Sequence, residues 1–429
     1  MVTLNEVAGL GLLQSPSEAA TTALERTESN YKSLENFVLP KDRQYQQQFA
    51  DIYFLRLAKI KPAVEEVASA AWEGTTLGGE TATKVDRVLD VRQGQLCWVA
   101  GTIYMDMPLK PSVLEDVAKD RWISAPTTAD RYYSEAGGES IMLEDDSGRI
   151  RLVGDVLKNY FLVTGCIIAV MGTENVNGEF EVIDLKFADL PPQPERWALS
   201  RPAGSAGDKK PKVRAEVKEE DVEMSDSRPS KKIAIVSGLE FSGTDTSYAM
   251  ELDLLLEFLL GEALDPAAQA ELAHISRLII AGNSIAKPSE HDAADRKGHK
   301  KYGYDASSYN PVPSQLLDGF LATLLPTIPV TLLPGAHDPA NASYPQQPIH
   351  SAMFPAARAY PFQDDEPFVM KDCPHLYFVG CQPEFGTKVI EGPQGQMVRL
   401  VLVPSFAATK EIVLVDTETL DVSKVKITI

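Results

Sequence analysis

The chain has 429 residues, of which 44% are hydrophobic and 24% charged, and its 61 acidic and 41 basic residues give a formal net charge of −20. This length exceeds one ordinary hydrophobic core, so we expect two or three domains, and no stretch approaches the roughly 20 apolar residues of a membrane span. The negative charge argues against a protein whose main ligand is DNA or RNA, because phosphate contacts need clustered lysine and arginine.

The first 80 residues divide into two parts. Residues 1–40 are rich in Ser, Thr and Glu and show little periodicity, which predicts a disordered N-terminus without a signal peptide. Residues 41–80 are predicted to be helical, because apolar side chains recur every three or four residues between Tyr45 and Trp72. Pro62 lies within this pattern, so we expect one helix that is kinked or broken at the proline, or two short helices.

Residues 81–198 contain short β-rich segments separated by turns. The candidate strands are residues 95–104, 139–145, 149–156, 162–172 and 178–190, with hairpin turns at residues 145–148 and 175–178. Such a series of strands predicts a small β-barrel, with an OB-fold as the leading candidate. Barrel aromatics can stack on nucleic-acid bases, but these strands carry as much acid as base. We therefore expect roles in the core or in protein contacts for Trp98, Tyr104, Phe161 and Phe180.

Residues 199–231 have no aromatic residue and are rich in charge, proline and serine, which predicts a disordered linker. Basic clusters in this linker fit a nuclear import signal, and an ordinary solvated run of charges explains them equally well. The candidate import residues are Lys209, Lys210, Lys212 and Arg214. Lys218 lies in a pattern that resembles a SUMO acceptor.

Residues 232–429 first alternate between apolar strand-like runs and amphipathic helical segments. We expect strands at residues 233–238, 277–282 and 328–335 and helices at residues 248–261 and 313–325. Four further strands, at residues 376–380, 397–403, 411–415 and 423–429, have no helix between them. This order predicts an α/β core with a terminal β-meander, within a multidomain α+β protein.

Four strands of this half end in glycine-containing loops, and the carboxyl ends of strands carry the ligand sites in open α/β sheets. A two-metal hydrolase needs Asp, His and Asn side chains in such loops, because hard divalent ions prefer carboxylate and imidazole ligands. The candidate residues of the four loops are Ser237, Gly238, Gly282, Asn283, Gly335, Ala336, His337, Asp338, Gly380 and Cys381.

This set is too poor in ligands to hold two metal ions. The first loop offers no carboxylate or imidazole, and the second offers only the amide of Asn283. In the third loop Ala336 stands where a hydrolase would place a ligand beside the catalytic histidine. We therefore interpret His337 and Asp338 as a structural pair that holds a turn, and we expect no catalytic residue, no metal and no cofactor.

Two other groups of potential ligands carry little weight. The constellation His291, Asp295 and His299 would share one face of a helix, but its Lys-, Gly- and Ser-rich surroundings indicate a solvated loop. The four cysteines include no C-x-x-C pair, so neither a zinc site nor a disulfide framework is expected.

Long motifs along the chain resemble the B-subunits of replicative DNA polymerases, and most closely those of polymerase delta. The resemblance runs from about Arg43 to Val415 and rests, in the first half, on RQYQQQFADIYFLRL, VAGTIYMDMPLKPSVL, LVTGCIIAV and FADLPPQ. In the second half it rests on VSGLEFSG, LIIAGN, PGAHDPAN, VPSFAATKEIVLV and, most specifically, YPQQPIHSAMFP and CPHLYFVGCQPEFGTKVIEGP.

The resemblance implies an OB-fold joined to a calcineurin-like phosphodiesterase fold that has lost catalysis, with a helical segment before them. It implies a scaffold that holds the C-terminal metal-binding module of the polymerase delta catalytic subunit and a third accessory subunit. In related complexes the same subunit serves a translesion polymerase. The resemblance also implies a nuclear location and contact with DNA only through the complex, without a membrane partner. Any iron–sulfur cluster would belong to the catalytic partner.

The sequence departs from the family near Ala359 and Pro361, where a long segment with a strand and a loop of the sheet is missing. Either this isoform lacks a sheet element, or the gene model has lost an exon. Such a gap would expose a hydrophobic edge and destabilise the second domain. Three alternative functions remain open at this stage. They are an active two-metal phosphoesterase, a stand-alone binder of single-stranded nucleic acid through the barrel, and the B-subunit of polymerase alpha or epsilon.

Overall fold

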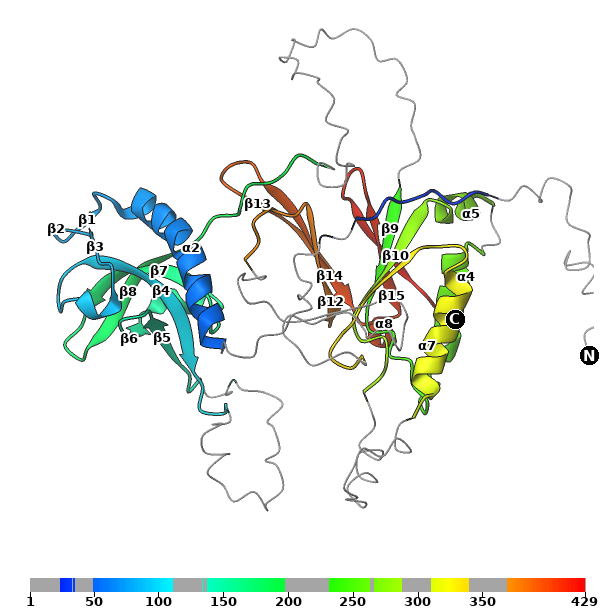
Figure 1. Ribbon diagram of the computed structural model, residues 1–429, viewed down its shortest axis with the longest axis horizontal. Coiled ribbons are helices and arrows are strands. Elements are labelled where there is room, and N and C mark those ends of the chain that lie inside the picture. Colours follow the sequence, from blue (N-terminus) through cyan, green and yellow to red (C-terminus); the bar gives the residue numbers. More distant parts are fainter. Residues whose placement is uncertain are drawn as a thin grey trace, which may run out of the picture.

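The computed structural model describes residues 24–32, 34, 49–110, 133, 137–196, 231–262, 266–287, 310–338 and 369–428. These residues form a β-barrel with one long helix and a second, two-sheet domain, which lie side by side and are joined by an extended stretch that follows the barrel (Figure 1). None of the helices in these ranges is long and apolar enough to cross a bilayer.

The barrel is built from the five strands expected in this part of the sequence. They are β4 (Cys97–Asp106), β5 (Ser140–Glu144), β6 (Arg149–Val153), β7 (Ile167–Glu174) and β8 (Glu179–Phe187). The order is β4-β5-β6-β8-β7, and β4 pairs again with β7, so the sheet closes on itself. The pairing of β6 with β8 is parallel, and the other pairs among these five strands are antiparallel. Both predicted hairpin turns join antiparallel neighbours.

The barrel core and the helix use opposite faces of the same strands. Side chains that point inward fill the barrel, among them Ile103, Leu143 and Phe180, all fully buried. The helix α2 (Phe49–Trp72) covers the outer face of β4 and β7, where buried Ala100 and Ala169 leave room for it. Strand β4 is therefore buried on both faces over most of its length.

Helix α2 is one element with Pro62 inside it, so of the two arrangements expected for this segment the structure has a single helix. Its last turn is fixed by Trp72, whose indole Nε1 donates a 2.9 Å hydrogen bond to Asp184 of β8. Short elements lie between α2 and the first barrel strand, and one more lies between β6 and β7. They are β1 (Thr76–Leu77), β2 (Glu80–Thr81), β3 (Thr83–Lys84), η3 (Val88–Asp90) and η4 (Asp155–Asn159).

The second domain has a main sheet with the order β11-β10-β9-β15-β16. Its parallel strands are β9 (Lys232–Val236), β10 (Ile275–Ala281) and β11 (Val330–Leu333), and β15 (Glu411–Asp416) and β16 (Val422–Lys426) complete it in antiparallel fashion. Among the described residues of this domain, the helices are α4 (Ala249–Leu260), α5 (Pro266–Leu272), α7 (Val312–Leu324) and the short α8 (Phe406–Thr409).

A second sheet covers the other face of the main sheet. It has the order β12-β14-β13, with β12 (Leu376–Gln382), β13 (Gly386–Glu391) and β14 (Met397–Pro404). One face of the main sheet packs on α4 and α7, and the opposite face packs on the second sheet through Ile235, Val401, Val403, Val413 and Val415. The strands between these layers read as continuous apolar runs because both of their faces are buried.

The predicted terminal meander is wrong. The last strands divide between two sheets, and β12 and β14 are parallel neighbours. The unpredicted β13 lies beyond β14 and pairs with it in an antiparallel hairpin, which leaves β14 in the centre. Strand β13 has four exposed and two half-buried residues, and its sequence, GTKVIE, lacks the apolar run of a core strand.

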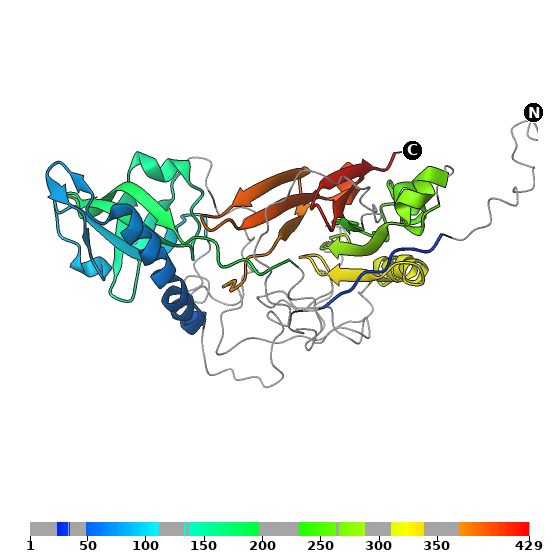
Figure 2. The ribbon, with the colours of Figure 1, turned by 90° about the horizontal axis from the view of Figure 1, so that it is seen from above.

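Within the N-terminus, for which the sequence predicts disorder, the structure describes residues 24–32 and 34. Residues 24–32 lie in an extended segment, dark blue in Figures 1 and 2, beside β10, α5 and β11 of the second domain. The linker predicted for residues 199–231 lies outside the described residues except at its end, as does the junction near residues 359–361.

The stretch between the two domains is docked on the second sheet. Gln193 exchanges hydrogen bonds with the backbone of Met397, 2.8 Å and 3.0 Å long, and the Cys373 N–H donates to Pro192 O at 3.0 Å. The buried Gln396 donates from its side-chain amide to the carbonyls of Leu190 and Pro191. This stretch is therefore held by specific contacts on its way out of the barrel.

Candidate functional site: the strand-end loops

The four candidate loops meet at the carboxyl ends of the parallel strands. The loops after β9, β10 and β11 belong to the main sheet. The fourth candidate pair, Gly380 and Cys381, lies not in a loop but in the last residues of β12, which approach from the second sheet. A Cβ atom at Gly380 would lie 2.0 Å from the carbonyl oxygen of Ala281, so the two sheets touch backbone to backbone here. The fold therefore gathers the residues that the sequence singled out, at the edge where a ligand site is expected.

In the first loop the fully buried Ser237 forms hydrogen bonds with neighbouring segments. Its hydroxyl accepts a 2.8 Å hydrogen bond from the Cys381 N–H and lies 3.0 Å and 3.2 Å from the carbonyl oxygens of Pro404 and Val403. The next residue, Gly238, donates from its N–H to the carbonyl of Gly282 at 2.9 Å. The hydroxyl is thus used within the protein rather than presented to a ligand.

The second and third loops leave no room between them. A Cβ atom at Gly335 would lie 2.3 Å from both the backbone nitrogen and the side-chain Oδ1 of Asn283. The Asn283 Oδ1 also accepts from the His337 N–H at 3.3 Å, and Asn283 itself has a left-handed φ of 50°. The amide that a hydrolase would offer to a metal is in this way occupied by the neighbouring loop.

Asp338 joins the same two loops through its carboxylate. Its Oδ2 accepts from the Gly335 N–H at 2.7 Å and its Oδ1 accepts from the Ile285 N–H at 2.9 Å. The side chain is only 7% exposed. Burial raises the pKa of the Asp338 carboxyl, and the backbone N–H donors oppose that rise without cancelling it. Both oxygens of the carboxylate hold the turn.

The remaining loop residues lie around a shallow hollow of about 330 Å³ that is lined partly by apolar Leu333 and Phe378. Cys381 borders it with a left-handed φ of 54°, and burial raises the pKa of the Cys381 thiol. Ala336 is exposed, and His337 is half-buried with its Nδ1 covered and without a hydrogen-bond partner. Within the described ranges no three His, Cys, Asp or Glu residues come together in a group that could hold a metal ion.

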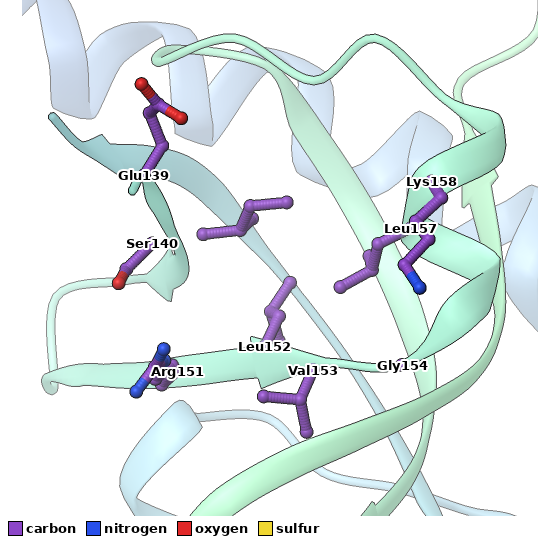
Figure 3. A pocket seen from close by; sticks show the side chains of 9 residues that line it. Glu139, Ser140, Arg151, Leu152, Val153, Gly154, Leu157 and Lys158 are labelled. Carbon is purple, nitrogen blue, oxygen red and sulfur yellow. The ribbon is translucent and has the colours of Figure 1, made fainter. Parts of the chain in front are cut away.

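The barrel offers a second hollow, of about 310 Å³, between β5, β6 and η4 (Figure 3). Apolar Leu152, Val153 and Leu157 lie between Arg151 and Lys158 at its rim. Arg151 forms an ion pair with Glu179 at 3.3 Å, and Lys158 forms one with Asp155 at 2.7 Å. These cations are therefore already neutralised by carboxylates, which is unlike a groove that binds phosphates.

The aromatic side chains considered for base stacking are divided between core and surface. Phe180 and Trp98 are buried, and the guanidinium of Arg149 lies 4.0 Å over the ring of Tyr104. Phe161 is fully exposed and stands beside the half-exposed Tyr160. The candidate stacking set is thus not assembled on one face.

Several predicted residues lie outside the described part of the chain. They are Lys209, Lys210, Lys212 and Arg214 of the candidate import signal, Lys218, and the constellation His291, Asp295 and His299. The sequence did not point to some residues that have clear structural roles. They are chiefly Gln193, Gln396 and Arg26, all of which form hydrogen bonds with backbone groups far away in the chain. Polar residues in polar stretches give no signal of such long-range contacts.

Comparison with known proteins agrees with both domains. Residues 48–185 match the family model of the DNA polymerase delta subunit OB-fold domain, which confirms the predicted OB-fold. Residues 233–359 match the family model of the B-subunit of DNA polymerases alpha and epsilon. The second match ends at residue 359.

Curated relatives cover nearly the whole chain. The DNA polymerase delta small subunit of Saccharomyces cerevisiae is 28% identical over 91% of both chains. The DNA polymerase delta small subunit of Arabidopsis thaliana is 27% identical over 90% of this chain and 92% of its own. DNA polymerase delta subunit 2 of Drosophila melanogaster is 26% identical over 92% of this chain and 97% of its own. Over about nine tenths of its length the chain is thus similar to small subunits of DNA polymerase delta, and its two domains match two family models of DNA polymerase subunits.

Proposed function

We propose that this chain is a non-catalytic accessory subunit of a DNA polymerase delta assembly and that it works through its surfaces rather than through an active site. The observation that carries the proposal is the closure of the strand-end loops by their own backbone at Gly335 and Gly380. The names of the relatives support the delta assembly over those of alpha and epsilon.

The second domain is, in this proposal, a calcineurin-like phosphodiesterase fold that has lost its chemistry. Support comes from the two facing sheets with helices on the outer face and from the position of the loops at the strand ends. The Asp338 carboxylate and the Asn283 amide, the most ligand-like groups of the loops, bond to neighbouring backbone N–H groups instead.

The family resemblance supplies the proposed partners. The chain would hold the C-terminal module of the polymerase delta catalytic subunit and a third accessory subunit, for use in replication and repair, and would serve a translesion polymerase as well. It would act in the nucleus, with Lys209, Lys210, Lys212 and Arg214 as the candidate import signal. Contact with DNA would be indirect, which agrees with the net charge of −20 and with the neutralised cations of the barrel.

The chain is also proposed to lack a segment of the family near Ala359 and Pro361. The match to the alpha and epsilon family model ends at residue 359, which agrees with a break in the family pattern there. Sequencing of the transcript across this junction tests the proposal. An uninterrupted reading frame identical to the present sequence supports a real deletion, and additional coding sequence between the two motifs contradicts it.

Co-purification tests the proposed assembly. The full chain, tagged and expressed together with the catalytic chain of polymerase delta, alpha or epsilon from the same organism, is expected to retain the delta chain through size-exclusion chromatography. Removal of the C-terminal module from the delta chain should abolish retention. Retention of only the alpha or epsilon chain, or of none of the three, would contradict the proposal.

A further inference from the structure

The N-terminal segment of residues 24–32 lies along the amino-terminal end of the main sheet, opposite the strand-end loops (Figure 1). The same segment, dark blue in Figure 2, borders a hollow together with Ser276, Thr327 and Pro329, close to the start of β11. The chain therefore contacts the second domain first, then forms the barrel, and only then forms the second domain itself. We call residues 24–32 the N-terminal strap.

Arg26 is the main anchor of the strap. Its guanidinium donates hydrogen bonds to the carbonyl oxygens of Leu259 at 2.7 Å, Ile275 at 2.8 Å and Leu272 at 3.3 Å. Leu259 lies in the last turn of α4, Leu272 is the last residue of α5, and Ile275 is the first residue of β10. Carbonyl groups at helix ends lack partners within the helix and carry partial negative charge, so a cation is well suited to this place.

The end of α4 shows why this contact matters. Gly261, in the left-handed conformation, donates to Phe258 and lets Glu262 donate to Glu257, which is the usual way to satisfy the last carbonyls of a helix. Neither of these two hydrogen bonds reaches the carbonyl oxygen of Leu259, which accepts a hydrogen bond from Arg26 instead. The strap thus completes the C-terminal cap of a core helix.

The strap continues in register with the stretch that leads from α5 into β10. The Thr27 N–H donates to Ala273 O at 3.0 Å, and the Ser29 hydroxyl donates to Ser276 O at 3.1 Å. In return the Arg277 Nε donates to the Ser29 hydroxyl at 3.2 Å, and the Arg277 guanidinium lies 4.7 Å from the centre of the Tyr31 ring. The carbonyl oxygen of Glu28 accepts from the Lys231 Nζ at 2.9 Å, so each of the four consecutive residues 26–29 is hydrogen-bonded to the second domain.

From this geometry we infer that the second domain has a peptide-binding groove, lined by carbonyl acceptors, that recognises an extended Arg-Thr-x-Ser segment and that is occupied by the chain's own residues 26–29. The acceptors are the carbonyl groups of Leu259, Leu272, Ala273, Ile275 and Ser276, which come from two helix ends and the start of a strand. The strap is a second tether between the domains, in addition to the docked stretch around Gln193.

Hydrogen exchange on the full chain tests the occupancy of the groove. The amide of Thr27 is expected to exchange at least about tenfold more slowly than that of an unstructured segment, because it is hydrogen-bonded to Ala273. Arg26→Ala should remove this protection and speed exchange in the peptides that cover the ends of α4 and α5. Lys32→Ala is the matched control, because it removes one positive charge from the exposed end of the same strap.

A peptide supplied in trans tests recognition directly. A labelled peptide of residues 22–34 should bind the full-length Arg26→Ala chain saturably, and its own Arg26→Ala version should bind at least about tenfold more weakly, because three charge-assisted bonds are lost. If the Arg26→Ala chain does not fold, the exchange rate of Thr27 in the unaltered chain decides. Exchange at the unstructured rate there, or equal effects of Arg26→Ala and Lys32→Ala, would overturn the inference.

Discussion

The two ends of the main sheet differ in how clearly sequence motifs mark them and in the contacts that hold their loops and neighbouring segments. The carboxyl end has the motifs of an active site, yet its loops are held by their own backbone, with Gly380 against Ala281 and Gly335 against Asn283. The amino end has no recognisable motif, yet Arg26 and its neighbours contact it through a series of directed hydrogen bonds.

This difference teaches that a loop motif typical of ligand sites and an actual binding function are separate properties. Glycines at the ends of strands let loops approach closely around a ligand, and the same freedom lets neighbouring loops pack directly against one another. Asp338 illustrates the change, since its carboxylate oxygens accept from the Gly335 and Ile285 backbone. A structural account of the carboxyl end therefore predicts effects on stability, and an enzymatic account predicts effects on turnover.

The largest effect is expected for Gly380→Ala. The new Cβ would lie 2.0 Å from Ala281 O, so the two sheets must separate, and we expect the free energy of unfolding to fall by about 3 kcal/mol. Gly319→Ala in α7 is the matched control, because its Cβ would meet no atom within 4 Å and helical Gly→Ala changes usually stabilise. Urea titration of both chains measures the difference. Similar midpoints for the two would contradict close contact between the loops.

The second effect separates the two members of the His-Asp pair. Asp338→Ala leaves the Ile285 and Gly335 N–H groups without their acceptors, which should lower the free energy of unfolding by about 2 kcal/mol. His337→Ala should change it by no more than about 0.5 kcal/mol, because the imidazole Nδ1 has no partner. Thermal or urea unfolding gives both values. A larger loss for His337→Ala would show that the histidine has a role that the structural account omits.

A third change tests the strain at the loop ends. Cys381 has a left-handed φ of 54°, which costs a residue with a side chain about 1 kcal/mol, so Cys381→Gly should stabilise the chain by up to about that amount. Cys166→Gly, at a position without positive φ, should instead destabilise it by about 1 kcal/mol. Equal losses for the two glycine variants would indicate that the contact between the Cys381 Sγ and the carbonyl oxygen of Ala281, 3.9 Å long, outweighs the backbone strain.

The smallest effect is a pH dependence. Because the pKa of Asp338 is raised in the folded chain, the folded state binds more protons than the unfolded state between the unfolded pKa of 3.8 and the higher folded value. The stability that this group contributes is full below 3.8 and is lost as the pH rises through the folded pKa. The free energy of unfolding of the unaltered chain, compared with that of Asp338→Asn, should therefore fall as the pH rises through that window and stay constant above it. If the unaltered chain instead becomes more stable than Asp338→Asn as the pH rises, burial is not the cause.

Much of the fold could be predicted because its elements are local patterns. The barrel strands and the strand–helix alternation after Lys232 follow from apolar periodicity and turn residues, and the poverty of ligands in the loops follows from residue identity alone. What could not be predicted depends on contacts between distant segments. The parallel pairing of β12 with β14 and the binding of Arg26 join residues that are not neighbours in the sequence. The same is true of the Ser237 hydroxyl, which accepts from the Cys381 N–H and donates to the carbonyls of Val403 and Pro404. Periodicity carries no information on such pairs.

A phosphodiesterase assay tests the central claim most directly. The full chain, purified and supplied with manganese and a generic phosphodiester such as bis(4-nitrophenyl) phosphate, is expected to give no turnover above buffer, and His337→Ala is expected to give the same baseline. Manganese-dependent turnover that His337→Ala abolishes would contradict the account and would restore the strand-end loops as an active site.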